Sequence, residues 1–88
     1  MNADVFSDAR LVVVDDHRPN VLALEALLGQ WGVPEIFTTT VSSDAVGLCA
    51  QVDPDLVLLD LHMPAPDGFE VMRQLRAVST SSLPLPVL

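Results

Sequence analysis

The sequence predicts an α/β fold in which an open sheet of parallel strands is covered by helices. Two unbroken apolar runs, at residues 11–14 and 56–59, are typical of strands that are buried on both faces. Segments with a helical spacing of apolar residues lie between the candidate strands. Strand and helix therefore alternate along the chain, and this alternation favours right-handed crossovers within a parallel sheet.

The first helix is expected between the strand at residues 11–14 and a second strand at residues 35–39. Pro19 suits its first turn, where the missing N–H costs little, and Gly32 suits its C-terminal cap. Between these two residues, apolar side chains recur at steps of three and four: Val21, Leu24, Leu27, Leu28 and Trp31. Such spacing is typical of a helix that packs one face against a core.

A second helix is expected to run to about Val52, with Ser42 or Ser43 as its N-terminal cap. The Asp-Pro-Asp sequence at residues 53–55 ends this helix and leads into the strand at residues 56–59. The inward-facing residues of the helix would be Ala45, Leu48, Cys49 and Val52.

A third helix is expected after the Asp-Gly turn at residues 67–68. A polar loop at residues 79–82 follows it, and residues 85–88 begin a fourth strand. The third helix would contain Phe69, Met72, Leu75 and Arg76. The sequence thus predicts that strands and helices alternate along the chain up to the beginning of a fourth strand.

Composition argues against several classes of function. The chain has 88 residues, with twelve acidic residues against four arginines and no lysine, so its net charge is −8. Such a surface repels phosphate backbones and anionic lipid, which makes direct contact with nucleic acid or a membrane surface unfavourable.

The single cysteine, Cys49, allows no internal disulfide and suits a small core position. Residues 1–9 lack the apolar run of a signal peptide, so we expect a flexible N-terminal segment and a cytoplasmic protein.

Three acidic residues stand where apolar strands end. Asp15 and Asp16 follow the first strand, and Asp60 follows the strand at residues 56–59. In open α/β sheets, functional groups gather at the carboxyl ends of the central strands. Two carboxylates ~5 Å apart repel by roughly 3 kcal/mol at an effective dielectric constant near 20, and a bound Mg²⁺ removes that repulsion. A carboxylate beside the metal can act as a nucleophile and form an aspartyl phosphate. The alternative is that these residues merely end strands and begin turns.

Longer motifs around these residues carry a resemblance to a known family. Val-Val-Val-Asp-Asp at residues 12–16 resembles the first strand and acidic pair of the receiver domains of bacterial two-component response regulators, the CheY-like family. Leu-Leu-Asp-Leu-His-Met-Pro at residues 58–64 resembles their third strand, phosphoacceptor and following loop. Asp67-Gly68 matches the turn before the next helix, and residues 85–88 resemble the start of the fourth strand.

The resemblance implies a flavodoxin-like fold and a role for each motif residue. Asp60 would accept a phosphoryl group from a sensor histidine kinase or a histidine phosphotransfer protein. Asp15 and Asp16 would hold Mg²⁺, one of these two through water, together with Asp60, and the backbone carbonyl of His62 would supply another ligand. Pro64 would shape the loop, and Gly68 would allow a tight turn. The chain would be a signalling module and not an enzyme.

The family's full fold has five strands and five helices, whereas this sequence ends in the fourth strand. We therefore expect residues 10–88 to form an incomplete receiver domain that could self-associate through an exposed sheet edge. A second hypothesis is a degenerate receiver that serves only as a scaffold for protein interaction or dimerisation. A third is a phosphatase resembling the haloacid dehalogenases, but that family needs Asp-x-Asp, and here the second position is His62.

Overall fold

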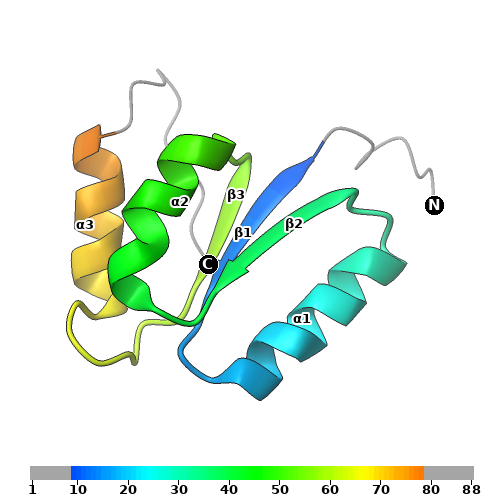
Figure 1. Cartoon of the computed structure of the whole chain (residues 1–88), viewed down its shortest axis with the longest axis horizontal. Coiled ribbons are helices and arrows are strands. Elements are labelled where there is room, and N and C mark those ends of the chain that lie inside the picture. The colour runs from blue at the N-terminus through cyan, green and yellow to red at the C-terminus, as the bar shows by residue number, and fades with distance from the viewer. Residues whose placement is uncertain (1–8, 79–88) are drawn as a thin grey trace.

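The computed structural model describes residues 9–78 and confirms the predicted alternation of strands and helices. Three strands alternate with three α-helices, and a single 3₁₀ turn precedes the second helix (Figure 1). The bounds are β1 Arg10–Val14, α1 Arg18–Gln30, β2 Glu35–Thr39, η2 Ser42–Asp44, α2 Ala45–Val52, β3 Leu56–Leu59 and α3 Gly68–Val78.

The strands form a parallel sheet in the order β2-β1-β3. Strand β1 is therefore central, and Val14 at its end pairs with Thr39 of β2 and Leu59 of β3. Helix α1 lies on one face of the sheet, whereas α2 and α3 lie side by side on the other face (Figure 1). Because all three strands run in the same direction, their carboxyl ends meet at one edge of the molecule.

Side chains of β1 alternate between two separate apolar clusters, one on each face of the sheet. Val12 and Val14 point towards α2 and α3, whereas Leu11 and Val13 point towards α1. All four are at most 5 % exposed. This double burial explains why the strand reads as an unbroken apolar run and not as an alternation of apolar and polar residues.

The predicted ends of α1 are confirmed. Pro19 lies in the first turn of the helix. Gly32 has φ of +86°, a left-handed conformation that a residue with a Cβ rarely adopts. The amide of Val33 then donates to the carbonyl of Leu28, which satisfies one of the free carbonyl groups at the end of the helix.

The predicted serine cap of the second helix is wrong. Neither η2 nor α2 has a side-chain hydrogen bond at its N-terminal cap. The chain enters the helix through one tight turn, in which the Asp44 amide donates to the Val41 carbonyl. The Ser42 hydroxyl instead donates to the Pro64 carbonyl, 3.4 Å away in the loop that follows β3. A backbone hydrogen bond of the turn thus stabilises the start of the helix, where a hydrogen bond to the serine side chain was expected.

The predicted polar loop at residues 79–82 and fourth strand at residues 85–88 lie outside the described residues, as does most of the N-terminal segment. Between residues 9 and 78, no helix has the length and apolar character that crossing a bilayer requires.

Candidate functional site

The three predicted carboxylates converge at the carboxyl edge of the sheet. Asp15 and Asp16 follow β1, and Asp60 follows β3, the strand that pairs directly with β1. One carboxylate oxygen from each residue lies within 4.8 Å of the others. Asp15 is buried, Asp60 is partly buried and Asp16 is exposed. The cluster therefore has a buried side, formed by Asp15, and a side that is open to solvent.

Asp15 is held on the buried side by backbone and side-chain hydrogen bonds. Its amide donates to the Thr39 carbonyl at 3.2 Å, which extends the pairing of β1 with β2 by one residue. Its Oδ1 accepts the His17 amide at 2.9 Å, and its Oδ2 accepts the Asn20 side-chain amide at 3.3 Å. Asp15 is 8 % exposed and is the one charged residue that is buried within the described part of the chain. Both of its oxygens have partners, as burial of a carboxylate requires.

Asp60 is held less tightly. Its amide donates to the Val14 carbonyl at 2.9 Å, so its backbone is fixed to the central strand. Its Oδ1 accepts the His62 amide at 3.0 Å. Within residues 9–78, no donor is bonded to its Oδ2. One oxygen of this carboxylate is thus oriented by the loop, and the second is available for chemistry.

Gly68 lies against the backbone of the Asp60 loop. It is buried, and a Cβ at this position would stand 2.5 Å from the Leu61 Cα and closer still to the Asp60 carbonyl oxygen. Its φ is not positive, so glycine is needed here for lack of space and not for a left-handed backbone. The first turn of α3 approaches the Asp60–Leu61 peptide so closely that no side chain fits between them. Sequence reasoning identified this residue, and the structure adds the close approach to the Asp60–Leu61 backbone as the reason that glycine is needed here.

The described residues offer the acidic cluster no compensating cation. Their two salt bridges, Arg10 with Glu35 and Arg73 with Glu70, involve none of the three aspartates. Each pair of carboxylates at ~5 Å repels by about 3 kcal/mol at an effective dielectric constant of 20. Three convergent carboxylate oxygens are the hard ligands that Mg²⁺ prefers, and one or two carboxylates with several waters complete its octahedron. The donor set therefore fits this metal.

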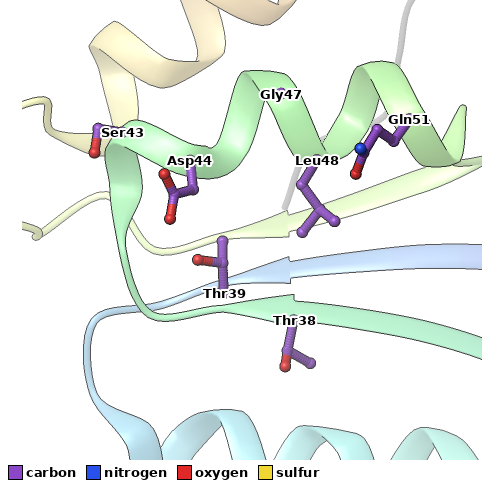
Figure 2. Close-up of a pocket in the computed structure, with 7 residues that line it drawn as sticks. All are labelled: Thr38, Thr39, Ser43, Asp44, Gly47, Leu48 and Gln51. Atoms are coloured by element: carbon purple, nitrogen blue, oxygen red, sulfur yellow. The ribbon is translucent and has the colours of Figure 1, made fainter.

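An open, polar groove lies between β2 and α2 (Figure 2). None of the three aspartates lines it. Its lining residues are Thr38, Thr39, Ser43, Asp44, Gly47, Leu48 and Gln51. The acidic cluster is thus separate from this groove, and the exposure of Asp16 leaves it accessible from solvent.

Sequence reasoning missed Asn20 in this site. The residue lies in the first turn of α1, and its amide reaches back to the carboxylate that ends β1. An amide side chain one turn into a helix that directly follows an acidic pair is the signal that could have identified it. Asn side chains are common near helix starts for several reasons, so the pattern alone is not specific.

Comparison with known proteins agrees with this geometry. The response regulator receiver domain family matches residues 11–88. The sensory/regulatory protein RpfC of Xanthomonas campestris pv. campestris is 32 % identical over 74 residues, which are 84 % of this chain and 10 % of that protein. The chain thus spans about a tenth of the length of the curated relatives that it matches.

Solved structures of receiver domains have the same fold. The receiver domain of the histidine kinase CKI1 from Arabidopsis thaliana, complexed with Mg²⁺ and BeF₃⁻, has a TM-score of 0.86 at 23 % identity, over 97 % of this chain and 66 % of that one. The chemotaxis protein CheY4 of Vibrio cholerae has a TM-score of 0.81 at 24 % identity, over 90 % of this chain and 64 % of that one. The N-terminal domain of a response regulator receiver protein from Methanoculleus marisnigri has a TM-score of 0.80 at 27 % identity, over 92 % of this chain and 64 % of that one.

The sheet order, the flanking helices and the flavodoxin-like topology are thus those of a receiver domain, and the described chain contains part of that fold. The matches favour a module of two-component phosphorelay signalling over the scaffold that was considered as an alternative. From its family match over residues 11–88 and the architecture that brings Asp15, Asp16 and Asp60 together, this chain belongs to the response regulator receiver domain family.

Proposed function

We propose that Asp60 accepts a phosphoryl group from a phosphohistidine of a sensor histidine kinase or a histidine phosphotransfer protein. The observation that carries the proposal is the convergence of Asp15, Asp16 and Asp60, whose oxygens lie within 4.8 Å of one another at the edge of the sheet. The domain acts as a signalling module and not as an enzyme. It occupies residues 10–88, follows an N-terminal segment of residues 1–9, and works in the cytoplasm, where its phosphodonor is found.

The metal site of this proposal uses the three carboxylates and the backbone carbonyl of His62. Bound Mg²⁺ would neutralise the charge that develops on the phosphoryl oxygens during transfer. The exposed side of the cluster, at Asp16, gives access to solvent and to a partner. The buried side, at Asp15, fixes one carboxylate through two hydrogen bonds.

Transfer requires a carboxylate oxygen with a free lone pair. The Oδ2 atom of Asp60 attacks the phosphorus, a new P–O bond forms, and the P–N bond to the donor imidazole breaks. The electron pair of that bond returns to the imidazole nitrogen. The His62 amide, bonded to Oδ1 at 3.0 Å, holds the carboxylate in place while the other oxygen reacts.

Substitution of the acidic residues tests this proposal. The chain is incubated with Mg²⁺ and a small acyl phosphate donor, and intact-mass spectrometry measures the addition of one phosphoryl group. We expect Asp60→Asn to abolish the addition, because an amide is a far weaker nucleophile than a carboxylate. Asp16→Asn should retain Asp60 but require a higher Mg²⁺ concentration, since one charged ligand is lost.

Asp53→Asn is the matched control. Asp53 has φ of +53° at the C-terminal end of α2, a conformation that Asn also tolerates, and it lies outside the acidic cluster. This variant should gain the phosphoryl group as the wild type does. Labelling of Asp60→Asn at the wild-type rate would show that another residue is the acceptor.

Self-association through a sheet edge stays a prediction. In the described sheet, β2 and β3 are the outer strands, each with one side that pairs with β1. Sedimentation velocity over a range of protein concentrations measures it, and a mass that stays monomeric throughout would contradict it.

A further inference from the structure

We propose that Asn20 is a positioning residue of the metal site, which holds the Asp15 carboxylate in the orientation that Mg²⁺ requires. The inference rests on the proposed function of the acidic cluster. It goes beyond that proposal because Asn20 belongs to a helix and is not one of the carboxylates. The contact that carries it is the hydrogen bond from the Asn20 side-chain amide to Asp15 Oδ2, 3.3 Å long.

Asp15 is constrained from two directions. The His17 amide holds Oδ1 and belongs to the short loop between β1 and α1, whereas Asn20 holds Oδ2 and belongs to the first turn of the helix. The bond to Oδ1 alone would leave the carboxylate some freedom to turn about its Cβ–Cγ bond, and the second bond, at Oδ2, restricts that motion further. With two oxygens fixed, the remaining lone pairs have defined directions with respect to Asp16 and Asp60.

The chemistry of the amide suits this role. Asn20 is neutral, so it orients the buried carboxylate without cancelling the negative charge that attracts a cation. An arginine or lysine at this position would provide a permanent cation beside the cluster, and an aspartate or glutamate would add a fourth negative charge. A side-chain amide also offers two N–H groups and one oxygen, so it can donate to Asp15 and still be satisfied by water.

The backbone of Asn20 is fixed independently of its side chain. Its amide donates to the His17 carbonyl at 3.0 Å, and α1 continues for ten residues beyond it. The side chain itself is exposed. Replacement by alanine therefore removes the bond to Asp15 without opening a cavity, and alanine is the better helix former of the two. The loss of positioning can thus be separated from a loss of stability.

Mg²⁺ and Ca²⁺ distinguish positioning from simple support of the fold. Mg²⁺ demands a near-ideal octahedron with short bonds, whereas Ca²⁺ accepts longer bonds and irregular geometry. A carboxylate that rotates more freely should therefore weaken Mg²⁺ binding more than Ca²⁺ binding. Partial unfolding of the site would weaken both by the same factor.

The experiment is a calorimetric titration of the 88-residue chain with each metal, for wild type, Asn20→Ala, Asn20→Gln and Gln30→Ala. Loss of a residue that orients a metal ligand typically lowers metal affinity about 10–100-fold, and we expect Asn20→Ala to show this loss for Mg²⁺. The loss for Ca²⁺ should be smaller, so the preference for Mg²⁺ should fall. Asn20→Gln keeps the donor one methylene further out and should recover part of the affinity.

Gln30→Ala is the control, since it removes an exposed amide from the other end of the same helix. It should bind both metals as the wild type does. Urea unfolding without metal should show that Asn20→Ala is at least as stable as the wild type.

Two results would overturn the inference while leaving the proposed function intact. The first is that the wild type binds Mg²⁺ and the Asn20→Ala variant binds it equally tightly. The other is an equal loss of Mg²⁺ and Ca²⁺ affinity together with a lower urea midpoint, which would assign Asn20 a purely structural role. A wild type that binds no Mg²⁺ would overturn both proposals, because Asn20 would then have no site to position.

Discussion

Gly68 lies where two backbone segments come into contact, and its substitution should show how tightly they fit. In Gly68→Ala, the new methyl group meets the Asp60–Leu61 peptide, which is rigid backbone and not the end of a mobile side chain. Overpacking of this kind costs about 1–3 kcal/mol, and urea unfolding measures it.

Gly47→Ala is the comparison for that experiment. Gly47 lies within α2, and a Cβ there meets nothing within 4 Å. Because glycine is a poor helix former, this variant should gain up to ~1 kcal/mol of stability. If Gly68→Ala left the urea midpoint unchanged or raised it, as Gly47→Ala is expected to do, the contact inferred at Gly68 would be wrong.

Cys49 provides a prediction about pH. Burial in the cluster on the α2 face raises the pKa of its thiol from 9.0 to about 11, because the charged thiolate is poorly solvated there. The folded state thus holds this proton more tightly than the unfolded state. The resulting stabilisation is fully present below pH 9 and is lost as the pH rises through about 11.

The composition makes this effect measurable. The chain has no lysine and no tyrosine, so Cys49 is the side chain whose ordinary pKa falls in this range. The urea midpoint of the wild type should therefore fall more steeply above pH 9 than that of Cys49→Ala. At pH 8, iodoacetamide should modify the native thiol far more slowly than the thiol of the unfolded chain. Equal rates in the two states would contradict a buried thiol.

At the scale of single residues, the sequence predicts what depends on chain position. Asp15, Asp16 and Asp60 are predictable because an acidic residue directly follows each strand, and parallel strands bring those ends together. The bond from Asn20 is not predictable, because it depends on the angle at which α1 leaves the sheet. The close approach at Gly68 depends in the same way on the position of α3, although the glycine itself is visible in the sequence.

Helix α3 gives a prediction at the scale of elements. The Asp67 carboxylate accepts the Glu70 amide at 2.9 Å and so caps the start of this helix. Asp67→Ala should lower the free energy of unfolding by about 1 kcal/mol, because a backbone N–H loses its partner. Asp67→Asn keeps an oxygen in the same place and should retain most of the stability. Urea unfolding of the two variants checks this, and equal losses would show that the charge of Asp67 matters more than its hydrogen bond.

Prediction of the elements succeeded where local patterns decide the structure. The apolar runs of β1 and β3, the proline at the start of α1 and the glycine after its end all act within a few residues. The turn η2 was missed because two serines suggested a cap, whereas the backbone bond from Asp44 to Val41 closes the turn.

A clamp formed by Arg10 could not be predicted either, because it joins distant parts of the chain. Its guanidinium pairs with Glu35 of β2 at 2.9 Å and donates to the Val52 carbonyl at the end of α2. Its backbone amide also donates to the Asp55 carboxylate at 2.9 Å. These contacts lie at the amino ends of the strands, opposite the acidic cluster.

At the scale of the whole molecule, Mg²⁺ should stabilise the fold. A ligand that binds only the folded state stabilises it by about 2.7 kcal/mol when its free concentration is 100 times Kd. The midpoint temperature of thermal unfolding should rise as MgCl₂ is added. In NaCl of the same ionic strength, the midpoint should be lower than in MgCl₂. Asp60→Asn should show a much smaller rise. If NaCl were as effective as MgCl₂, the stabilisation would come from general screening of the net charge of −8.

The overall architecture was predictable because the elements agree with one another. Buried strands that alternate with helices admit few topologies, and the order β2-β1-β3 is one of them. The predicted fourth strand at residues 85–88 lies beyond the described residues and stays a prediction. The division of the core into two clusters follows from β1, which contributes side chains to both.

The backbone amides of Asp15 and Asp60 are part of the sheet, since they donate to carbonyls of β2 and β1 respectively. The peptide groups that carry two of the three carboxylates therefore belong to the same cooperative unit as the central strand. Fraying of these positions breaks strand-to-strand hydrogen bonds, so their amide protons should exchange with solvent only as slowly as the sheet itself opens. We therefore expect the backbone at Asp15 and Asp60 to open only together with the sheet, so that adjustment to a bound group falls to the side chains and to the loop that follows Asp60.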